Sequence, residues 1–273
     1  MIAASAFPDM LARAMRRIAT VALACLTTSC SKGPSWARLP ENHVLGDTTV
    51  SGDPAAVHRF ATAPTVDGRL DDLAWASATT LGPLVGSDRG EPDTSVLAGS
   101  WAKIGFDDQA LYLGFFVRDT EPFSPAGRRE TDPHLWERSS AVEVMLQPGD
   151  PGDNRDYYEM QFDANGAVFD THWDDYNQPI SEKPTGTVFG HQDWSCNAQR
   201  AATVDSAGYT IELAIPWSAF GPARTAIPPR SGDVWRLNLY AFRDGQRVAS
   251  AWSSIRRQGN FHRSSRFGRV KFD

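Results

Sequence analysis

Residues 66–75 read Val-Asp-Gly-Arg-Leu-Asp-Asp-Leu-Ala-Trp and combine a turn, a helix start and a large aromatic side chain. The Asp67-Gly68 pair favours a tight turn, because Gly accepts positive φ and Asp hydrogen-bonds to nearby backbone. Asp71 is expected to be the N-cap of a short helix over residues 72–78, with Trp75 as its buried anchor. The stretch holds no catalytic chemistry, so it indicates where a domain begins and what kind of domain follows.

After this stretch, apolar and polar residues alternate with a period of two, which predicts half-buried strands. Five segments show the pattern: residues 111–117, 142–146, 157–163, 209–215 and 235–241. Turn residues separate them, at Asp107-Asp108, 148–152, Asn165-Gly166, Ala207-Gly208 and Asp244-Gly245. The sequence therefore predicts an all-β fold, an antiparallel β-sandwich of the immunoglobulin or jelly-roll kind with short helical turns.

Polar side chains occupy the second face of three of these strands. The simpler interpretation is a face turned toward solvent. The alternative is a concave polar face that binds a polar ligand. The residues concerned are Glu143, Glu159, Gln161, Asp163, Arg236, Asn238 and Tyr240.

Residues 1–29 have the composition of a bacterial secretory signal. Arginines at 13, 16 and 17 precede the apolar stretch 18–26, which is too short to span a bilayer. Small residues then precede Cys30 as in a lipobox, so Cys30 is expected to carry a lipid, with Cys25 as the alternative. Neither of the two residues directly after Cys30 is acidic, which by resemblance favours sorting to the outer membrane. We therefore expect a protein of the cell envelope that meets the membrane only through its lipid anchor.

The remaining chain divides into a tether and a domain. Residues 30–52 are rich in Pro, Gly, Ser and Thr without periodicity, which is typical of a linker, and residues 53–273 form the expected domain. Removing residues 1–29 changes the net charge from −6 to −8, because three arginines and one aspartate are lost. An acidic surface argues against nucleic acid as a partner.

Cysteine content allows few disulfides. With Cys30 lipidated, Cys196 has no partner and is expected to be a small buried hydrophobe. If Cys25 were the lipidated residue, Cys30 and Cys196 could form a pair.

Five segments, taken in order, resemble a known family. They are residues 66–75, the turn and strand at 107–119, a Trp followed by a strand with a central Glu at 135–146, a strand broken by Pro at 208–220, and the C-terminal segment 251–272. Together they resemble carbohydrate-binding module family nine and the wider group of DOMON-like sandwiches, over residues 53–273. The resemblance implies a non-catalytic β-sandwich that binds carbohydrate and supports glycan catabolism.

In that family a sugar lies between two aromatic rings, and charged and amide side chains bind its hydroxyls. The resemblance places the rings at Trp136 and Phe261 and the ligand-binding Glu at Glu143. Asn238 matches an inward-pointing Asn, and Asp163 stands where the family has a basic sugar contact. A pyranose suits such a site, because its C–H face stacks on aromatic rings and its hydroxyls need directed hydrogen bonds. The candidate ligand-binding residues are Trp136, Glu143, Gln161, Asp163, Asn238, Tyr240 and Phe261.

An enzyme is the first alternative. A glycosidase needs two carboxylates about 5–10 Å apart, and Glu143, Glu159, Asp163 and Glu212 are candidates, although Glu212 fits a framework role better. The sequence has no Gly-x-Ser-x-Gly nucleophile elbow.

A haem-binding DOMON-like domain is the second alternative. It requires a Met/His or His/His axial pair, for which the sequence offers Met145 and Met160 on strands, and His172 and His191 in an expected loop region. His262 is a further polar candidate, with a structural hydrogen bond to a loop as its simpler role.

A structural calcium ion is the third. One loop is rich in side-chain oxygens, which are the ligands that Ca²⁺ accepts. Its spacing is not that of an EF-hand, and the alternative interpretation is a turn with solvated polar residues. The candidates are Asp150, Asp153, Asn154 and Asp156. No other cofactor is expected.

Overall fold

The computed structural model describes residues 49–273 except 184–185, 189 and 222. Within these described residues the helices span at most five residues, which agrees with the predicted short helical turns. The elements in chain order are β1 Ala55–Val57, α2 Leu73–Ser77, β2 Thr79–Leu81, β3 Val85–Gly86, β4 Trp101–Phe106, β5 Ala110–Val117, α3 Leu135–Arg138, β6 Ala141–Gln147, β7 Arg155–Asp163, β8 Val168–Asp175, β9 Ser181–Lys183, β10 Gly186–Val188, β11 Gln199–Val204, β12 Tyr209–Pro216, η2 Trp217–Ala219, β13 Val234–Arg243, η3 Gly245–Arg247, β14 Val248–Ala251, η4 Ser264–Arg266 and β15 Gly268–Phe272.

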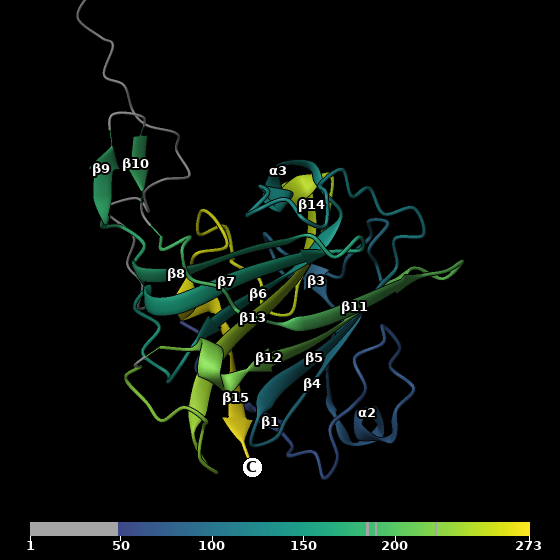
Figure 1. The fold of residues 1–273 in the computed structure, drawn as a ribbon, viewed down its shortest axis with the longest axis horizontal. Coiled ribbons are helices and arrows are strands. Elements are labelled where there is room, and N and C mark those ends of the chain that lie inside the picture. Colours follow the sequence, from purple (N-terminus) through teal and green to yellow (C-terminus); the bar gives the residue numbers. More distant parts are fainter. Residues whose placement is uncertain (1–48, 184–185, 189, 222) are drawn as a thin grey trace, which may run out of the picture. The chain divides into compact units, whose positions relative to one another are not determined.

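Two sheets lie face to face (Figure 1). The large sheet has the order β1-β15-β13-β6-β7-β8, with β14 paired to β13 and β3 to β14. The small sheet has the order β11-β12-β5-β4-β2, and β9 and β10 form a separate hairpin. All strand pairs in the two sheets are antiparallel except β1 with β15. The predicted antiparallel β-sandwich is confirmed.

Apolar side chains from both sheets fill the space between them. Alternate residues of the strands, such as Val144 on β6, Leu213 on β12 and Leu239 on β13, are fully buried there. Each such side chain contributes about 1.5–3 kcal/mol through burial. The five segments with period-two alternation are strands β5, β6, β7, β12 and β13, as predicted.

One carboxylate of the small sheet makes three hydrogen bonds to residues 66–75. Glu212 on β12 accepts hydrogen bonds from the backbone N–H of Asp67 at 2.9 Å and of Gly68 at 3.0 Å, and from Trp75 Nε1 at 2.8 Å. Gly68 has φ +89°, and a Cβ there would lie 2.8 Å from the carbonyl carbon of Ala202, so the turn requires glycine. Trp75 is 1% exposed, which confirms its prediction as a buried anchor.

Two local predictions were wrong. The N-cap of α2 is Asp72 rather than Asp71, and the Asp72 carboxylate accepts the backbone N–H of Thr65 at 2.6 Å instead of capping the helix. His172, expected in a loop region, lies on strand β8, which pairs with β7.

The predictions for the N-terminal region fall mostly on residues that the structure does not describe. These are the signal segment, lipidation at Cys30 or Cys25, and the tether up to residue 48. Within the described part of the chain, no helix is long and apolar enough to cross a membrane. Cys196 is buried, and burial raises the pKa of its thiol, which agrees with the prediction of a small buried hydrophobe.

Candidate functional site

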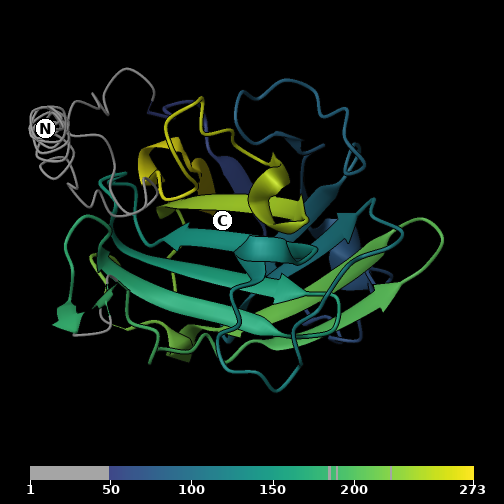
Figure 2. The ribbon, with the colours of Figure 1, turned by 90° about the horizontal axis from the view of Figure 1, so that it is seen from above.

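The second face of the large sheet is covered. The seven polar residues on it are at most 4% exposed, so its interpretation as a solvent-facing surface was wrong. The C-terminal segment 252–267 packs over this face, where Phe261 and Phe267 join an apolar cluster with Met145 and Tyr157. Figure 2 shows this yellow segment on the side of the large sheet opposite to β11 and β12.

One cross-strand row, named here the acid–amide row, runs across this face. Trp136 of α3 packs edge-on against one end residue of the row, with ring centroids 4.5 Å apart. Phe261 stacks on the other end residue at 3.9 Å. The structure thus anchors the two predicted aromatic residues over opposite ends of one row, with the acid and the amide between them. The members of the row, successive Cα partners on β8, β7, β6 and β13, are Phe169, Gln161, Glu143 and Tyr240.

Amide and indole groups hold two acids in place here. Gln161 Nε2 donates to Glu159 Oε1 at 2.8 Å and lies 3.4 Å from Glu143 Oε2. Gln246 Nε2 donates to the same Glu143 oxygen at 3.1 Å. Trp173 Nε1 donates to Glu159 Oε2 at 3.1 Å. Neutral donors therefore bind both oxygens of Glu159 but only one oxygen of Glu143.

Three oxygens in this group have no hydrogen-bond partner among the described residues although they are buried: Glu143 Oε1, Gln161 Oε1 and Thr171 Oγ1. Thr171 on β8 is the Cα partner of Glu159, so the three oxygens belong to adjoining positions of neighbouring strands. A buried polar atom without a partner costs about 1–3 kcal/mol. A ligand that donates hydroxyl hydrogens would recover this cost.

Aromatic side chains surround the acids on the β8 side. The ring of Trp173 is parallel to that of Tyr157, with centroids 6.1 Å apart and 6° between planes. His262 stacks on Tyr176 at 4.3 Å, and its Nδ1 is hydrogen-bonded to the Tyr157 hydroxyl at 2.7 Å. His262 therefore has a structural hydrogen bond, although to strand β7 rather than to a loop.

The aromatic residues differ in how much surface they offer to a ligand. Phe261 is 6% exposed, with its ring on Tyr240, whereas Trp136 and Trp173 are both partly exposed. Trp173 lies next to an acid, since it bonds to Glu159, whereas Trp136 contacts Phe169 and has one ring face covered by His134, stacked at 4.2 Å. Sequence reasoning missed Trp173, as well as Thr171 and Gln246. The Asn165-Gly166 turn was the signal for Trp173 and Thr171, because such a turn predicts that the residues after it form a hairpin strand with β7.

Burial controls the charge of the acids. It raises the pKa of Glu159 to about 7, although the N–H groups of Trp173 and Gln161 favour the ionised form. Burial, followed by the charge of Glu159, raises the pKa of Glu143 well above its usual value. Burial also lowers the pKa of His262 to about 3, so this ring is neutral and its 3.7 Å contact with Glu159 is not an ion pair. Glu159 thus exchanges its proton near neutral pH, and burial disfavours the ionised form of both acids.

Two of the predicted ligand-binding residues have structural contacts. Asn238 exchanges two hydrogen bonds with the backbone of Ser253, at 2.7 and 2.9 Å, and so fastens the covering segment. Asp163 accepts the backbone N–H groups of Asn165 at 3.0 Å and Ala167 at 2.8 Å, and so closes the turn between β7 and β8. Sugar contacts by these two residues stay predictions.

Arginines pair with the three aspartates proposed for calcium. Asp150 lies 2.9 Å from Arg236, Asp153 lies 2.7 Å from Arg224, and Asp156 lies 3.0 Å from the same Arg224. Guanidinium groups next to each carboxylate repel a cation, so the donor set does not favour Ca²⁺.

The haem candidates are not arranged as axial pairs. Met145 and Met160 are fully buried on opposite faces of the large sheet. The rings of His172 and His191 are stacked at 5.7 Å with 19° between planes, so they lie side by side instead of facing each other across an iron. Glu212, one of the candidate catalytic acids, binds residues 66–75 as its framework role requires.

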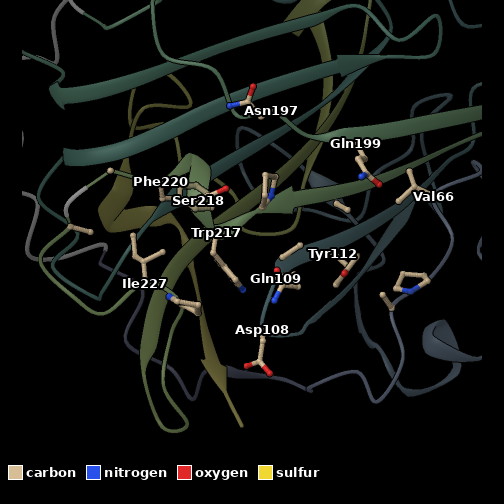
Figure 3. A pocket seen from close by; sticks show the side chains of 18 of the residues that line it. Val66, Asp108, Gln109, Tyr112, Asn197, Gln199, Trp217, Ser218, Phe220 and Ile227 are labelled. Carbon is tan, nitrogen blue, oxygen red and sulfur yellow. The ribbon is translucent and has the colours of Figure 1, made fainter.

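A separate groove of about 920 Å³ lies on the outer face of the small sheet (Figure 3). Gln109, Asn197 and Gln199 contribute polar groups to its walls, and the hydroxyl of Tyr112 already donates to Asp107 at 2.9 Å. It contains none of the predicted ligand-binding residues. Among the described residues that line it, none has a buried polar side-chain atom without a partner. The acid–amide row is therefore the stronger candidate.

Solved structures of low identity share the fold. A carbohydrate-binding module family 9 from Caldicellulosiruptor kristjanssonii, in complex with cellotriose, is 17% identical with a TM-score of 0.54, over 81% of this chain and 94% of that chain. A family 9 module from the same organism in complex with glucose is 16% identical with a TM-score of 0.50, over 80% and 95%. A candidate carbohydrate-binding protein from Bacteroides uniformis ATCC 8492 is 17% identical with a TM-score of 0.61, over 82% and 100%. No curated protein matches the chain.

A family model described as carbohydrate family 9 binding domain-like matches residues 66–273. The match begins at Val66, the first residue of the stretch that binds Glu212, and includes every member of the acid–amide row. Because it covers more than half of the chain, the chain belongs to the carbohydrate family 9 binding domain-like family.

Proposed function

We propose that this protein binds carbohydrate without cleaving it, at the acid–amide row of the large sheet. The observation that carries the proposal is the set of adjoining buried oxygens on Glu143, Gln161 and Thr171 that have no partner among the described residues. Family membership supports it, and so do the family 9 modules of the same fold that are complexed with cellotriose and glucose.

The chemistry of the row suits a sugar. Hydroxyls of the ligand donate to Glu143 Oε1 and Gln161 Oε1, and the bond to the carboxylate is charge-assisted when Glu143 is ionised. Trp173, and the face of Trp136 that His134 does not cover, offer aromatic surface for the C–H face of the sugar ring. Because these oxygens are buried, the ligand is expected to reach them from the side on which Gln246 and Trp173 are partly exposed.

The cellular setting follows from the sequence. A lipid at Cys30 would hold the domain at the cell envelope, with the outer membrane as the expected location. A binding module there retains glycan close to the cell and thereby supports its catabolism.

A glycan array tests the function. Wild type is expected to bind at least one glycan, with glucose and cello-oligosaccharides included as probes, and to release no reducing sugar. Trp173→Ala is expected to weaken that binding at least about tenfold, since loss of an aromatic platform costs about 1–3 kcal/mol by analogy with stacked bases.

Trp101→Ala is the matched control, because Trp101 is also partly exposed but packs on Phe116 in the small sheet. It is expected to bind as wild type does. Absence of binding to any glycan would overturn the proposed function. A Soret band in the purified protein would support the haem alternative instead.

A further inference from the structure

Two histidines and an aspartate converge at the edge strand β8 of the large sheet. His172 and Asp174 are two residues apart on β8, so their side chains leave the same side of the strand. The backbone of His191 pairs with that of His172 through N···O distances of 2.7 and 3.4 Å. One potential ligand atom from each of the three residues lies within 4.8 Å of the other two.

The arrangement is held from several sides. Asp174 places Oδ2 2.6 Å from His191 Nε2 and Oδ1 3.7 Å from His172 Nδ1. The ring of His172 stacks on Tyr158 at 4.7 Å, which fixes its position. The other ring nitrogen of His191, Nδ1, faces Asp193 at 3.9 Å. A carboxylate behind a histidine is the usual outer shell of a metal-binding imidazole.

We propose that His172, Asp174 and His191 bind one divalent transition-metal ion, with Zn²⁺ as the best-fitting member of the class. Imidazole nitrogens and a carboxylate oxygen bind zinc at about 2.0–2.2 Å, which sets tetrahedral ligand atoms about 3.4 Å apart. Small rotations of the side chains would bring the three ligand atoms to these separations, and Asp174 has room to rotate because its side chain is half-exposed. Three protein ligands leave a fourth position for water. Ca²⁺, which takes oxygen ligands, does not suit two imidazoles.

The local charge agrees with this assignment. Carboxylates lie against both imidazole rings, Asp174 beside His172 and His191, and Asp193 behind His191. A neutral imidazole is the form that binds a metal. Negative charge around the cluster attracts a cation.

The site is separate from the acid–amide row. His172 and Asp174 lie on the core-facing side of β8, whereas Thr171 and Trp173 lie on the other side. A bound ion would join β8 to the chain at residue 191 and stabilise this edge of the sheet. Its loss is expected to leave glycan binding unchanged.

Titration calorimetry of the full, tag-free chain, stripped with EDTA and then exchanged into metal-free buffer, tests the site with Zn²⁺, Mg²⁺ and Ca²⁺ as probes. Zn²⁺ is expected to bind with a defined high-affinity step and to raise the melting temperature by about 5 °C or more at saturation. His191→Ala and Asp174→Asn are each expected to weaken that step at least about tenfold, since even outer-shell changes cost 10–100-fold. Mg²⁺ and Ca²⁺ are expected not to reproduce it.

His58→Ala is the control, because His58 is an exposed histidine paired with Asp273 at 3.0 Å far from the cluster. It is expected to bind Zn²⁺ as wild type does. The proposal is overturned if stripped wild type shows no Zn²⁺ binding, or if both site variants bind Zn²⁺ as tightly as wild type. Circular dichroism of each variant confirms that it is folded.

Discussion

Glu212 shows how a single residue can connect the beginning of the domain to its sheet. Its carboxylate accepts three hydrogen bonds from residues 67–75, and the Trp75 indole that it binds is 137 positions away in sequence. The sequence indicated that Trp75 is buried and that Glu212 belongs to the framework. It did not predict that the two bind each other, because register and packing decide which distant groups meet.

Glu212→Ala is expected to lower the free energy of unfolding by roughly 3 kcal/mol, since it leaves buried donors at Gly68 and Trp75 without an acceptor. Urea denaturation measures the change. Glu121→Ala, an exposed glutamate, is the control and is expected to change stability by less than about 0.5 kcal/mol. An equal, small effect of both substitutions would contradict the anchoring role.

Glu159 makes stability depend on pH. Its folded-state pKa of about 7 lies above the usual 4.5, so the unfolded chain ionises first as the pH rises. The free energy of unfolding is therefore highest below pH 4.5 as far as this group is concerned. It falls as the pH rises to 7, by an amount on the order of a few kcal/mol.

Melting temperatures at pH 5 and pH 8 measure the effect, and Glu159→Gln is expected to reduce the difference between them. The raised pKa of Glu143 acts in the same direction, so some slope remains in that variant. A wild-type melting temperature that rises between these pH values would contradict the assignment.

Among the elements, β8 shows where pattern reading fails. Its core-facing side carries Asp170, His172 and Asp174, because it is an edge strand whose end lies beyond the apolar core. Both faces therefore contain polar residues, and no clear alternation of polarity is visible. Strands with one apolar face, such as β6 and β12, could be predicted. The burial of the second face could not, because it depends on segment 252–267 folding back over it.

The covering segment depends on Asn238. Asn238→Ala is expected to remove both bonds to Ser253 and to destabilise the segment by about 1–3 kcal/mol. Hydrogen exchange is expected to quicken in residues 252–267 more than in β12. Asn165→Ala, whose side chain is exposed and bonds to Ser124, is the comparison. Unchanged exchange in the segment would show that Asn238 does not hold it.

For the whole molecule, a series of individually weak motifs in the correct order was sufficient to predict the sandwich and the family. The individual residues of the site were harder to predict from the sequence. Trp136, Glu143, Gln161 and Phe261 were each candidates. The pairing of β6, β7, β8 and β13 puts Glu143 and Gln161 in one row, and Trp136 and Phe261 pack against the residues at its two ends. Trp173 was not a candidate, because its strand was not predicted.

The central claim is that carbohydrate binds at the acid–amide row, and titration calorimetry of the strongest glycan from the array tests it most directly. One binding site per chain is predicted for wild type. Glu143→Gln keeps the size of the side chain but leaves one acceptor oxygen where the acid has two, so either the ligand or Gln246 loses its acceptor. Its Kd is therefore predicted to be at least about tenfold higher. Equal Kd values for wild type and Glu143→Gln would contradict the claim.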